Sequence, residues 1–271
     1  MTKIELIQQI NLKSNFLCVG LDPDLDKIPK ICFDFEDPVF TFCKEIISHT
    51  SDLAVAYKPN LAFFESLGPK GWYTLEKVLN EIPDNCFTIA DAKRGDIGNT
   101  SRMYAKCFFE YFDFDAVTVA PYMGKDSIEP FLDFENKWVI LLGLTSNEGS
   151  KDFEFLNTEN GPLYKQVILK SASWFSSERL MFVVGATHPS LIQQVREWVP
   201  DYFFLVPGVG AQGGTIEEVC ANGLNADHGL LINNGRNIIY ASNHLDFGQA
   251  ARKVCLSNIQ EMKPYIKSNL L

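Results

Sequence analysis

Eight short apolar runs recur along the 271-residue chain, and they limit its fold more than any other feature. The runs are rich in β-branched and aromatic residues and almost continuously hydrophobic, which is typical of strands covered on both faces of a parallel sheet. They lie at 16–22, 53–59, 86–91, 116–122, 138–145, 180–187, 202–210 and 229–236.

Helix-like stretches separate the runs. Residues 100–112 repeat apolar side chains at a four-residue spacing, and Asn99 or Thr100 is the expected N-cap; residues 189–199 form a second such stretch that begins at a proline. No linker, repeat or low-complexity segment divides the chain. The alternation predicts one (β/α)8 TIM barrel, an α/β fold, as a single domain over 1–271. An open doubly wound sheet is the weaker alternative.

Composition narrows the classes of partner. A formal net charge of -10 argues against nucleic acid, which needs a basic face. The chain shows no signal peptide and no apolar stretch of about 18 residues, so we expect no membrane association. Its seven cysteines have no CxxC or zinc-like spacing and fall mostly in apolar runs, as buried thiols of a reducing compartment do. We therefore expect a cytoplasmic protein.

Polar residues stand at the ends of the predicted strands. In a (β/α)8 barrel the active site lies at the carboxyl ends of the strands, so these residues are candidates for it. They are Asp22, Lys58, Asp91, Lys93, Ser146, the loop 207–214 and Arg236.

The glycine-rich loop 207–214 contains a literal GxGxxG. A dinucleotide site would need an acidic residue at the end of the next strand, whereas Asp227 precedes that strand, so we reject this interpretation. Loops after strands seven and eight often bind phosphate in such barrels. Backbone N–H groups of the glycines, the Gln212 amide and the Arg236 guanidinium suit an anion there. The alternative is two ordinary turns with a surface arginine.

The stretch "ADAKRGDIGNTS" at 90–101 places alternating charges at the end of a core strand. Residues two apart on a strand share a face, so we expect Asp91 and Lys93 to point together, with Lys58 on a neighbouring strand. Asp96 precedes the helix and could reach a neighbouring site or subunit. A substrate carboxylate beside Asp91 would be repelled, and a carbanion beside Lys93 would meet a proton donor. This pattern favours decarboxylation of an anion without metal or cofactor.

These residues resemble a known family. "DAKRGDIGNT" fits the DxKxxDI motif of orotidine 5'-phosphate decarboxylase. Other stretches typical of the family occur before and after it, in the family's order, over about residues 16–240: "GLDPD", "YKPNLAFFE", "LTSNEG", "PGVGAQGG" and "NNGR". The chain most resembles the family's longer bacterial branch. The resemblance implies conversion of orotidine 5'-phosphate to UMP, the last step of de novo pyrimidine synthesis.

The resemblance also implies roles for the charged residues. Lys93 would donate the proton to C6 of the pyrimidine, and Asp91 would lie beside the departing carboxylate. Lys58 and Asp96 would complete the charged array, with Asp96 coming from the partner subunit of a homodimer. No cofactor and no metal are expected.

Substrate-binding roles follow from the same resemblance. Asp22 and Lys58 would hold ribose hydroxyls, Thr100 would reach the same region across the subunit interface, and Ser146 would contact the pyrimidine ring.

The 5'-phosphate would be held by Gln212 and Arg236. Because Gly235 precedes Arg236, part of the anion contact there is expected from the backbone. The segment 147–165 is long compared with the short-chain branch, and we expect a lid-like loop.

Some alternatives stay open from the sequence. A sugar-phosphate decarboxylase or aldolase of the same superfamily would use magnesium to stabilise an enediolate, and would need a further acidic cluster. A non-catalytic barrel that binds a phosphorylated ligand would have lost part of the charged array, which is intact here. Asn60 and Glu65 either contact ligand or are ordinary loop and helix-start residues.

Overall fold

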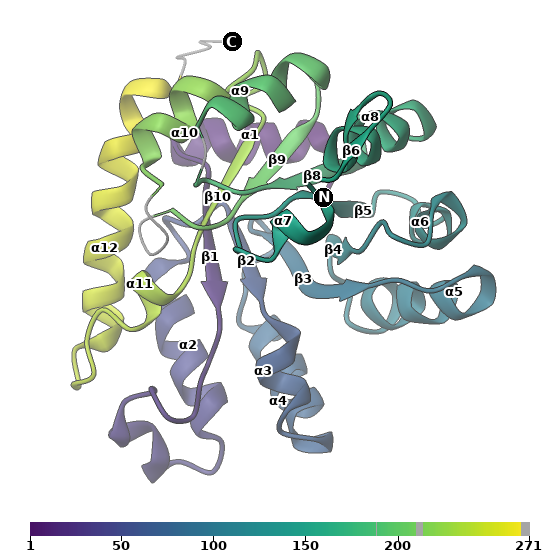
Figure 1. Cartoon of the computed structure of the whole chain (residues 1–271). Helices are drawn as coiled ribbons and strands as arrows, with labels where there is room; N and C mark the ends of the chain where they lie inside the picture. The colour runs from purple at the N-terminus through teal and green to yellow at the C-terminus, as the bar shows by residue number, and fades with distance from the viewer. Residues whose placement is uncertain (188, 210–213, 267–271) are drawn as a thin grey trace. The chain divides into compact units, whose positions relative to one another are not determined.

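The computed structural model describes residues 1–187, 189–209 and 214–266 (Figure 1). Its eight longer strands form a closed parallel barrel in the order β1-β10-β9-β8-β5-β4-β3-β2. Each predicted run overlaps one strand, and β3 continues three residues past its run, to Arg94, so the (β/α)8 prediction is confirmed and the open-sheet alternative is wrong. The strands are β1 (Leu17–Leu21), β2 (Ala56–Pro59), β3 (Phe87–Arg94), β4 (Ala116–Val119), β5 (Trp138–Leu144), β8 (Leu180–Val184), β9 (Phe203–Val206) and β10 (Leu230–Asn234).

Helices connect the strands in alternation along the chain, and a short separate hairpin is made of β6 (Asn157–Thr158) and β7 (Gly161–Pro162). The α-helices are α1 (Lys3–Lys13), α2 (Pro38–Thr50), α3 (Leu61–Glu65), α4 (Pro69–Asn80), α5 (Gly98–Lys106), α6 (Lys125–Leu132), α7 (Ser150–Phe153), α8 (Leu163–Trp174), α9 (Pro189–Trp198), α10 (Ile216–Gly223), α11 (Arg236–Ile239) and α12 (Phe247–Met262). The other helical turns are η1 (Lys30–Asp34), the π-helix η2 (Cys107–Tyr111) and η3 (Lys263–Tyr265).

The chain's internal contacts divide it into two compact units. The first unit comprises Met1–Ile7 and Lys93–Ile232, and the second comprises Gln8–Ala92 and Asn233–Leu271. The expectation of a single domain stays a prediction.

Strands β4, β5, β8 and β9 of the first unit pair in parallel and are completely or almost completely buried. A buried arginine of the first unit, Arg196 of α9, lies over the Phe204 ring, with its Cζ 3.7 Å from the ring centroid. Its guanidinium donates to five backbone carbonyls, those of Val199, Pro200, Tyr202, Gly223 and Gly229. Burial lowers the pKa of this guanidinium to about 9.

Two long helices of the second unit pack together, α12 against α2 (Figure 1). Phe42 of α2 stacks on Phe247 of α12 with ring centroids 5.5 Å apart. At the surface, Arg252 of α12 forms a two-pronged ion pair with Asp52, at 2.6 and 2.8 Å.

Asp37 fixes the start of α2. One carboxylate oxygen accepts a hydrogen bond from Phe40 N at 3.2 Å, and the other accepts from the Thr74 hydroxyl at 2.7 Å and from the Lys77 amine at 3.2 Å. Burial alone would raise the pKa of Asp37, but these donors outweigh it and the net shift is downward.

The start of α5 differs from the sequence prediction. The helix begins at Gly98 after an extended Ile97, so neither Asn99 nor Thr100 is its N-cap, and that prediction is wrong. Gly98 adopts a left-handed φ of 49°, which turns the chain into the helix early and leaves both residues in the first turn. The predicted helix at 189–199 is confirmed as α9. Helix α10 begins after Thr215, which forms a capping box with Glu218.

The segment 147–165 has regular structure of its own. It contains the single turn of α7, the β6–β7 hairpin and the first residues of α8. The sequence gives this segment little periodicity because each of these elements is too short to show one.

Candidate active site

The second unit contains a buried ion pair made of two predicted site residues. Lys58 in β2 and Asp91 in β3 have Nζ and Oδ2 2.5 Å apart, and their side chains are 6% and 10% exposed. A backbone bridge between Asn60 and Asp91 holds the ends of the two strands together. Two neighbouring parallel strands therefore bring these charges into contact, as expected from the sequence.

Burial alone would lower the pKa of Lys58. The negative charges of Asp91 and then Asp22, together with the Asp91 hydrogen bond, outweigh burial and raise the pKa above its ordinary value. Lys58 is thus an ammonium ion at neutral pH. Asp22, Lys58 and Asp91 act on one another electrostatically, and these three predicted residues are brought together.

Asp22 follows β1 and is fixed through its backbone. The Tyr240 hydroxyl donates to Asp22 O at 2.6 Å and accepts from Asp24 N at 2.7 Å. One carboxylate oxygen of Asp22, Oδ1, is buried and has no hydrogen-bond partner among the residues the structure describes. That oxygen is suited to accept a hydrogen bond from a ligand hydroxyl. Sequence reasoning missed Tyr240, since no local pattern links residues this far apart.

The turn before Arg236 lies directly on β1. A Cβ on Gly20 would be 3.1 Å from Gly235 Cα, so the close approach needs glycine at position 20. Arg236 is the first residue of α11, and its side chain is exposed. The predicted phosphate-binding arginine is therefore free to meet an anion at the end of the barrel strand β10.

Lys93, in the first unit, has an unusual backbone. Its φ is 48°, a left-handed conformation that non-glycine residues adopt rarely, and its N–H donates to the Thr118 hydroxyl of β4 at 2.8 Å. The expectation that Asp91 and Lys93 share a face assumed a regular strand, and this assumption is wrong at Lys93 because the alternation breaks there. Such strained backbone often occurs at functional sites.

Asp96 sits in a turn held by Ser101. The Ser101 hydroxyl donates to Asp96 O and lies 3.1 Å from Ser127 O, and the Asp96 carboxylate accepts from Ile97 N at 2.7 Å. Thr100 is exposed in the first turn of α5. Both residues expected to act across a subunit interface thus belong to one short, well-braced segment.

Ser146 follows β5 and lines a cavity of about 680 Å³ in the first unit. Lys151, Thr187 and Ser190 line it too. Gly185, just past β8, allows Ser146 to sit there, because a Cβ on Gly185 would be only 2.8 Å from Ser146 Cβ.

Two further side chains hold the strand end before Ser146. The Glu154 carboxylate accepts from Thr145 N at 2.8 Å and from the Thr145 hydroxyl at 2.6 Å. Sequence reasoning did not identify this contact, because Glu154 is one acidic residue among several in an irregular segment.

Three sequence predictions remain, those for Gln212, Asn60 and Glu65. Gln212 lies outside the described residues. Asn60 accepts from Ala62 N at 3.3 Å and caps α3, and Glu65 is the last residue of that helix. The helix-start interpretation of Asn60 is thus confirmed.

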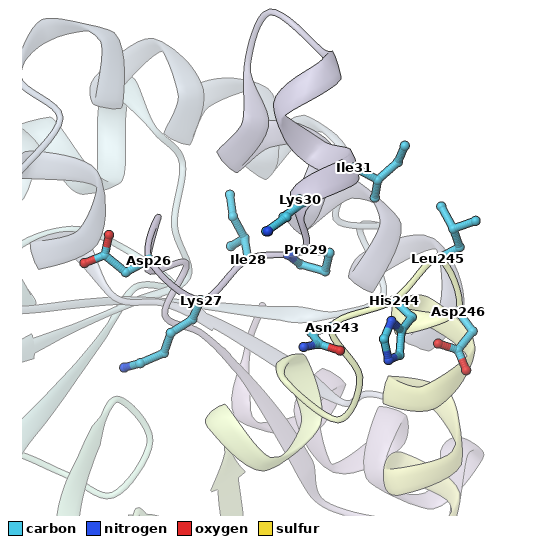
Figure 2. A pocket seen from close by; sticks show the side chains of 10 residues that line it. All are labelled: Asp26, Lys27, Ile28, Pro29, Lys30, Ile31, Asn243, His244, Leu245 and Asp246. Carbon is cyan, nitrogen blue, oxygen red and sulfur yellow. The ribbon is translucent and has the colours of Figure 1, made fainter.

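A second hollow, of about 820 Å³, lies in the second unit between 26–31 and 243–246 (Figure 2). None of the predicted site residues lines it. Its charges are largely balanced: Lys27 pairs with Asp24 at 2.9 Å, and Asp246 accepts from Ser242 at 2.6 Å. We therefore do not assign the active site to this hollow.

Within residues 1–187, 189–209 and 214–266, no group of three or more His, Cys, Asp and Glu side chains is arranged to hold a metal ion. In the same described part, no helix is long and apolar enough to cross a membrane.

A parallel eight-stranded barrel with a buried lysine–aspartate pair on neighbouring strands is typical of one class of protein, the (β/α)8-barrel enzymes. The model of one protein family, "Orotidine 5'-phosphate decarboxylase / HUMPS family", matches residues 15–253. The chain belongs to this family, and it is an enzyme of the family's decarboxylase branch. The resemblance noted from the motifs is confirmed.

Several relatives support this assignment over nearly the whole chain. The chain is 58% identical over 271 residues to the orotidine 5'-phosphate decarboxylase of Flavobacterium johnsoniae, covering 99% of each chain. It is 52% identical over 274 residues to that of Bacteroides fragilis strain YCH46, covering 100% of each. Among solved structures, OMP decarboxylase of Leishmania donovani superposes with a TM-score of 0.83 at 35% identity, covering 97% of this chain and 99% of that one. The Plasmodium berghei orotidine 5'-monophosphate decarboxylase superposes with a TM-score of 0.82 at 26% identity, covering 98% of this chain and 99% of that one.

Proposed function

We propose that the protein decarboxylates orotidine 5'-phosphate to UMP in the cytoplasm, as the last step of de novo pyrimidine synthesis, without metal or cofactor. The observation that carries the proposal is the buried Lys58–Asp91 pair, in a chain that matches relatives of this name over its full length. The magnesium-dependent sugar-phosphate reaction is the alternative that the experiment below tests.

In the proposed reaction the bond between C6 and the carboxylate carbon breaks, and carbon dioxide leaves without the bonding electron pair. The pair stays on C6 and takes a proton from the Lys93 ammonium, and the resulting amine regains a proton from water. Asp91 disfavours the substrate carboxylate by like-charge repulsion, and Lys58, which its neighbours keep protonated, stabilises the anionic site.

The described contacts support the proposed substrate-binding roles. Asp22 would accept from a ribose hydroxyl through its buried Oδ1, and Ser146 would contact the pyrimidine from the wall of its cavity. Arg236 and the Gly235 backbone, with Gln212, would hold the 5'-phosphate. Binding energy from the remote phosphate would then be realised at the reacting carbon.

We further propose that two copies share their active sites, with Asp96 and Thr100 completing the partner's site. Exposed apolar side chains occur beside Asp96, on α5 and in the β4–α6 loop of the first unit, and exposed apolar groups of this kind support a subunit contact. They are Ile97 (53% exposed), Met103 (48%), Tyr104 (37%), Tyr122 (92%) and Met123 (47%). The segment 147–165 would close as a lid beside Ser146.

Ultraviolet absorbance of UMP formation in EDTA tests the reaction, with Lys93→Ala as the variant and Lys170→Ala, an exposed lysine of α8, as the matched control. We expect metal-free turnover that collapses in Lys93→Ala and is unchanged in Lys170→Ala. Turnover that requires added magnesium, or full activity in Lys93→Ala, would refute the proposed mechanism.

Mixing two inactive variants, Lys93→Ala and Asp96→Asn, tests the shared site. In a randomly mixed dimer with shared sites, one of the two sites of each heterodimer regains both residues, so about one quarter of wild-type activity should return. No recovery after subunit exchange would contradict the shared arrangement.

A further inference from the structure

Glu154 joins the segment 147–165 to the end of β5. Its carboxylate accepts two hydrogen bonds from one residue, from Thr145 N at 2.8 Å and from the Thr145 hydroxyl at 2.6 Å. Its backbone is fixed too: Glu154 N donates to Ser150 O at 2.8 Å, and Glu154 O accepts from Tyr164 N at 2.9 Å at the start of α8. The carboxylate therefore stands on a braced part of the segment.

Thr145 is held by one more side chain and leads directly into Ser146. The Asn147 side chain lies 2.6 Å from the Thr145 hydroxyl, so that hydroxyl is bracketed by two polar groups of the same segment. A threonine whose N–H and O–H are both hydrogen-bonded has little freedom in φ or χ1. The orientation of the peptide between Thr145 and Ser146 is restricted as a result.

Ser146 is also confined from the opposite side. Gly185 N donates to Leu144 O at 2.9 Å, and a Cβ on Gly185 would lie 2.8 Å from Ser146 Cβ and 2.9 Å from Ser146 N. Ser146 is thus placed between the end of β8 and the Glu154–Thr145 contact, facing the cavity that it lines.

We infer that Glu154 is a positioning residue, which through Thr145 sets the orientation of Ser146 toward the pyrimidine of the substrate. The inference rests on the proposed function, because it gives Ser146 its ligand. It also assigns to the segment 147–165 a role beyond covering the site, because Glu154 belongs to that segment.

The contact requires hydrogen-bonding groups at position 154. Thr145 N and the Thr145 hydroxyl face the two carboxylate oxygens, and a carboxylate accepts at both. Leucine has a similar size and no polar atom, so Glu154→Leu removes both hydrogen bonds. Glutamine would retain them, because its oxygen can accept from Thr145 N and its NH2 group can donate to the Thr145 hydroxyl, which in turn donates to Asn147 Oδ1.

A double-mutant cycle on decarboxylation of orotidine 5'-phosphate tests the inference. We would measure kcat and KM for wild type, Glu154→Leu, Ser146→Ala and the double variant, with Glu159→Leu as control, an exposed glutamate in the turn between β6 and β7. We expect Glu154→Leu to lower kcat/KM about 10-fold to 100-fold, as small displacements of a substrate contact do. In the Ser146→Ala background the same change should have less than about a 2-fold effect, because the residue it positions is gone.

Each outcome separates the two proposals. Wild type without turnover refutes the proposed function, whatever the variants do. An active wild type with independent, multiplicative effects of Glu154→Leu and Ser146→Ala overturns the positioning role alone, as does an unchanged Glu154→Leu. If Glu154→Leu fails to fold, Thr145→Val, which removes the hydroxyl, and Thr145→Ser, which retains it, replace it. We then expect a loss in the valine variant and near-normal turnover in the serine variant, and equal turnover in both would overturn the inference.

Discussion

Replacing Asp91 by alanine leaves Lys58 buried without its main counter-charge, and this is the change whose effect the structure defines best. The Nζ–Oδ2 distance of 2.5 Å corresponds to an attraction of roughly 7 kcal/mol at an effective dielectric constant of 20, most of which offsets the burial of two charges. Removing one partner of such a pair costs about 3–5 kcal/mol, because the other charge stays buried.

The loss depends on pH in a defined direction. In the wild type the pKa of Lys58 is raised, so its contribution to stability is complete below the ordinary lysine value and is lost as pH rises through the raised pKa. Without Asp91, burial dominates and the pKa falls, so Lys58 sheds its proton at high pH and the penalty is relieved. The stability difference between wild type and Asp91→Ala should therefore shrink by about 2 kcal/mol or more between pH 7 and pH 10.

Urea unfolding at both pH values measures this difference. Asp52→Asn, which breaks the exposed pair with Arg252, is the matched control and should change stability by about 1 kcal/mol or less at either pH, because solvent screens that pair. A loss below about 1 kcal/mol in Asp91→Ala, or a loss equal at pH 7 and pH 10, would refute the reasoning.

Three further predictions concern single positions. Arg196→Met should lower the free energy of unfolding by about 3 kcal/mol or more, since it leaves several buried carbonyls without donors. Arg196→Lys should be destabilised as well, because one amine cannot reach the carbonyls that the planar guanidinium reaches. Urea unfolding measures both variants, and a fully stable lysine variant would contradict the role of the guanidinium. Asp37 has a lowered pKa, so its contribution to stability is present above the ordinary aspartate pKa and is lost as pH falls through the lowered pKa. Thermal unfolding should show Asp37→Asn clearly destabilised at pH 7 and close to wild type near pH 2. A stability difference that stays the same at both pH values would contradict the lowered pKa of Asp37. Gly185→Ala should lower kcat/KM for orotidine 5'-phosphate at least about 10-fold while circular dichroism stays unchanged, because its Cβ displaces Ser146; normal kinetics would show that the site tolerates the shift.

The sequence by itself determined the eight strands and most of the candidate site. Strands buried on both faces have a local signature, a short run of β-branched and aromatic residues, and β1 and β10 both lie within such runs. Lys58 and Asp91 could be paired in advance because parallel strands in sequence order are usually neighbours.

Only the tertiary structure decided which side chains hold these groups in place. Tyr240 fixes the loop of Asp22 from the other end of the chain, and the raised pKa of Lys58 is the outcome of burial against two charges on different strands. The left-handed backbone of Lys93, held by Thr118, likewise overrides the strand alternation that its sequence predicts. A local sequence pattern reflects the free energy of forming one helix or strand. The contacts of Tyr240, Lys58 and Lys93 depend instead on which distant parts of the chain meet, and this is decided only when the chain packs.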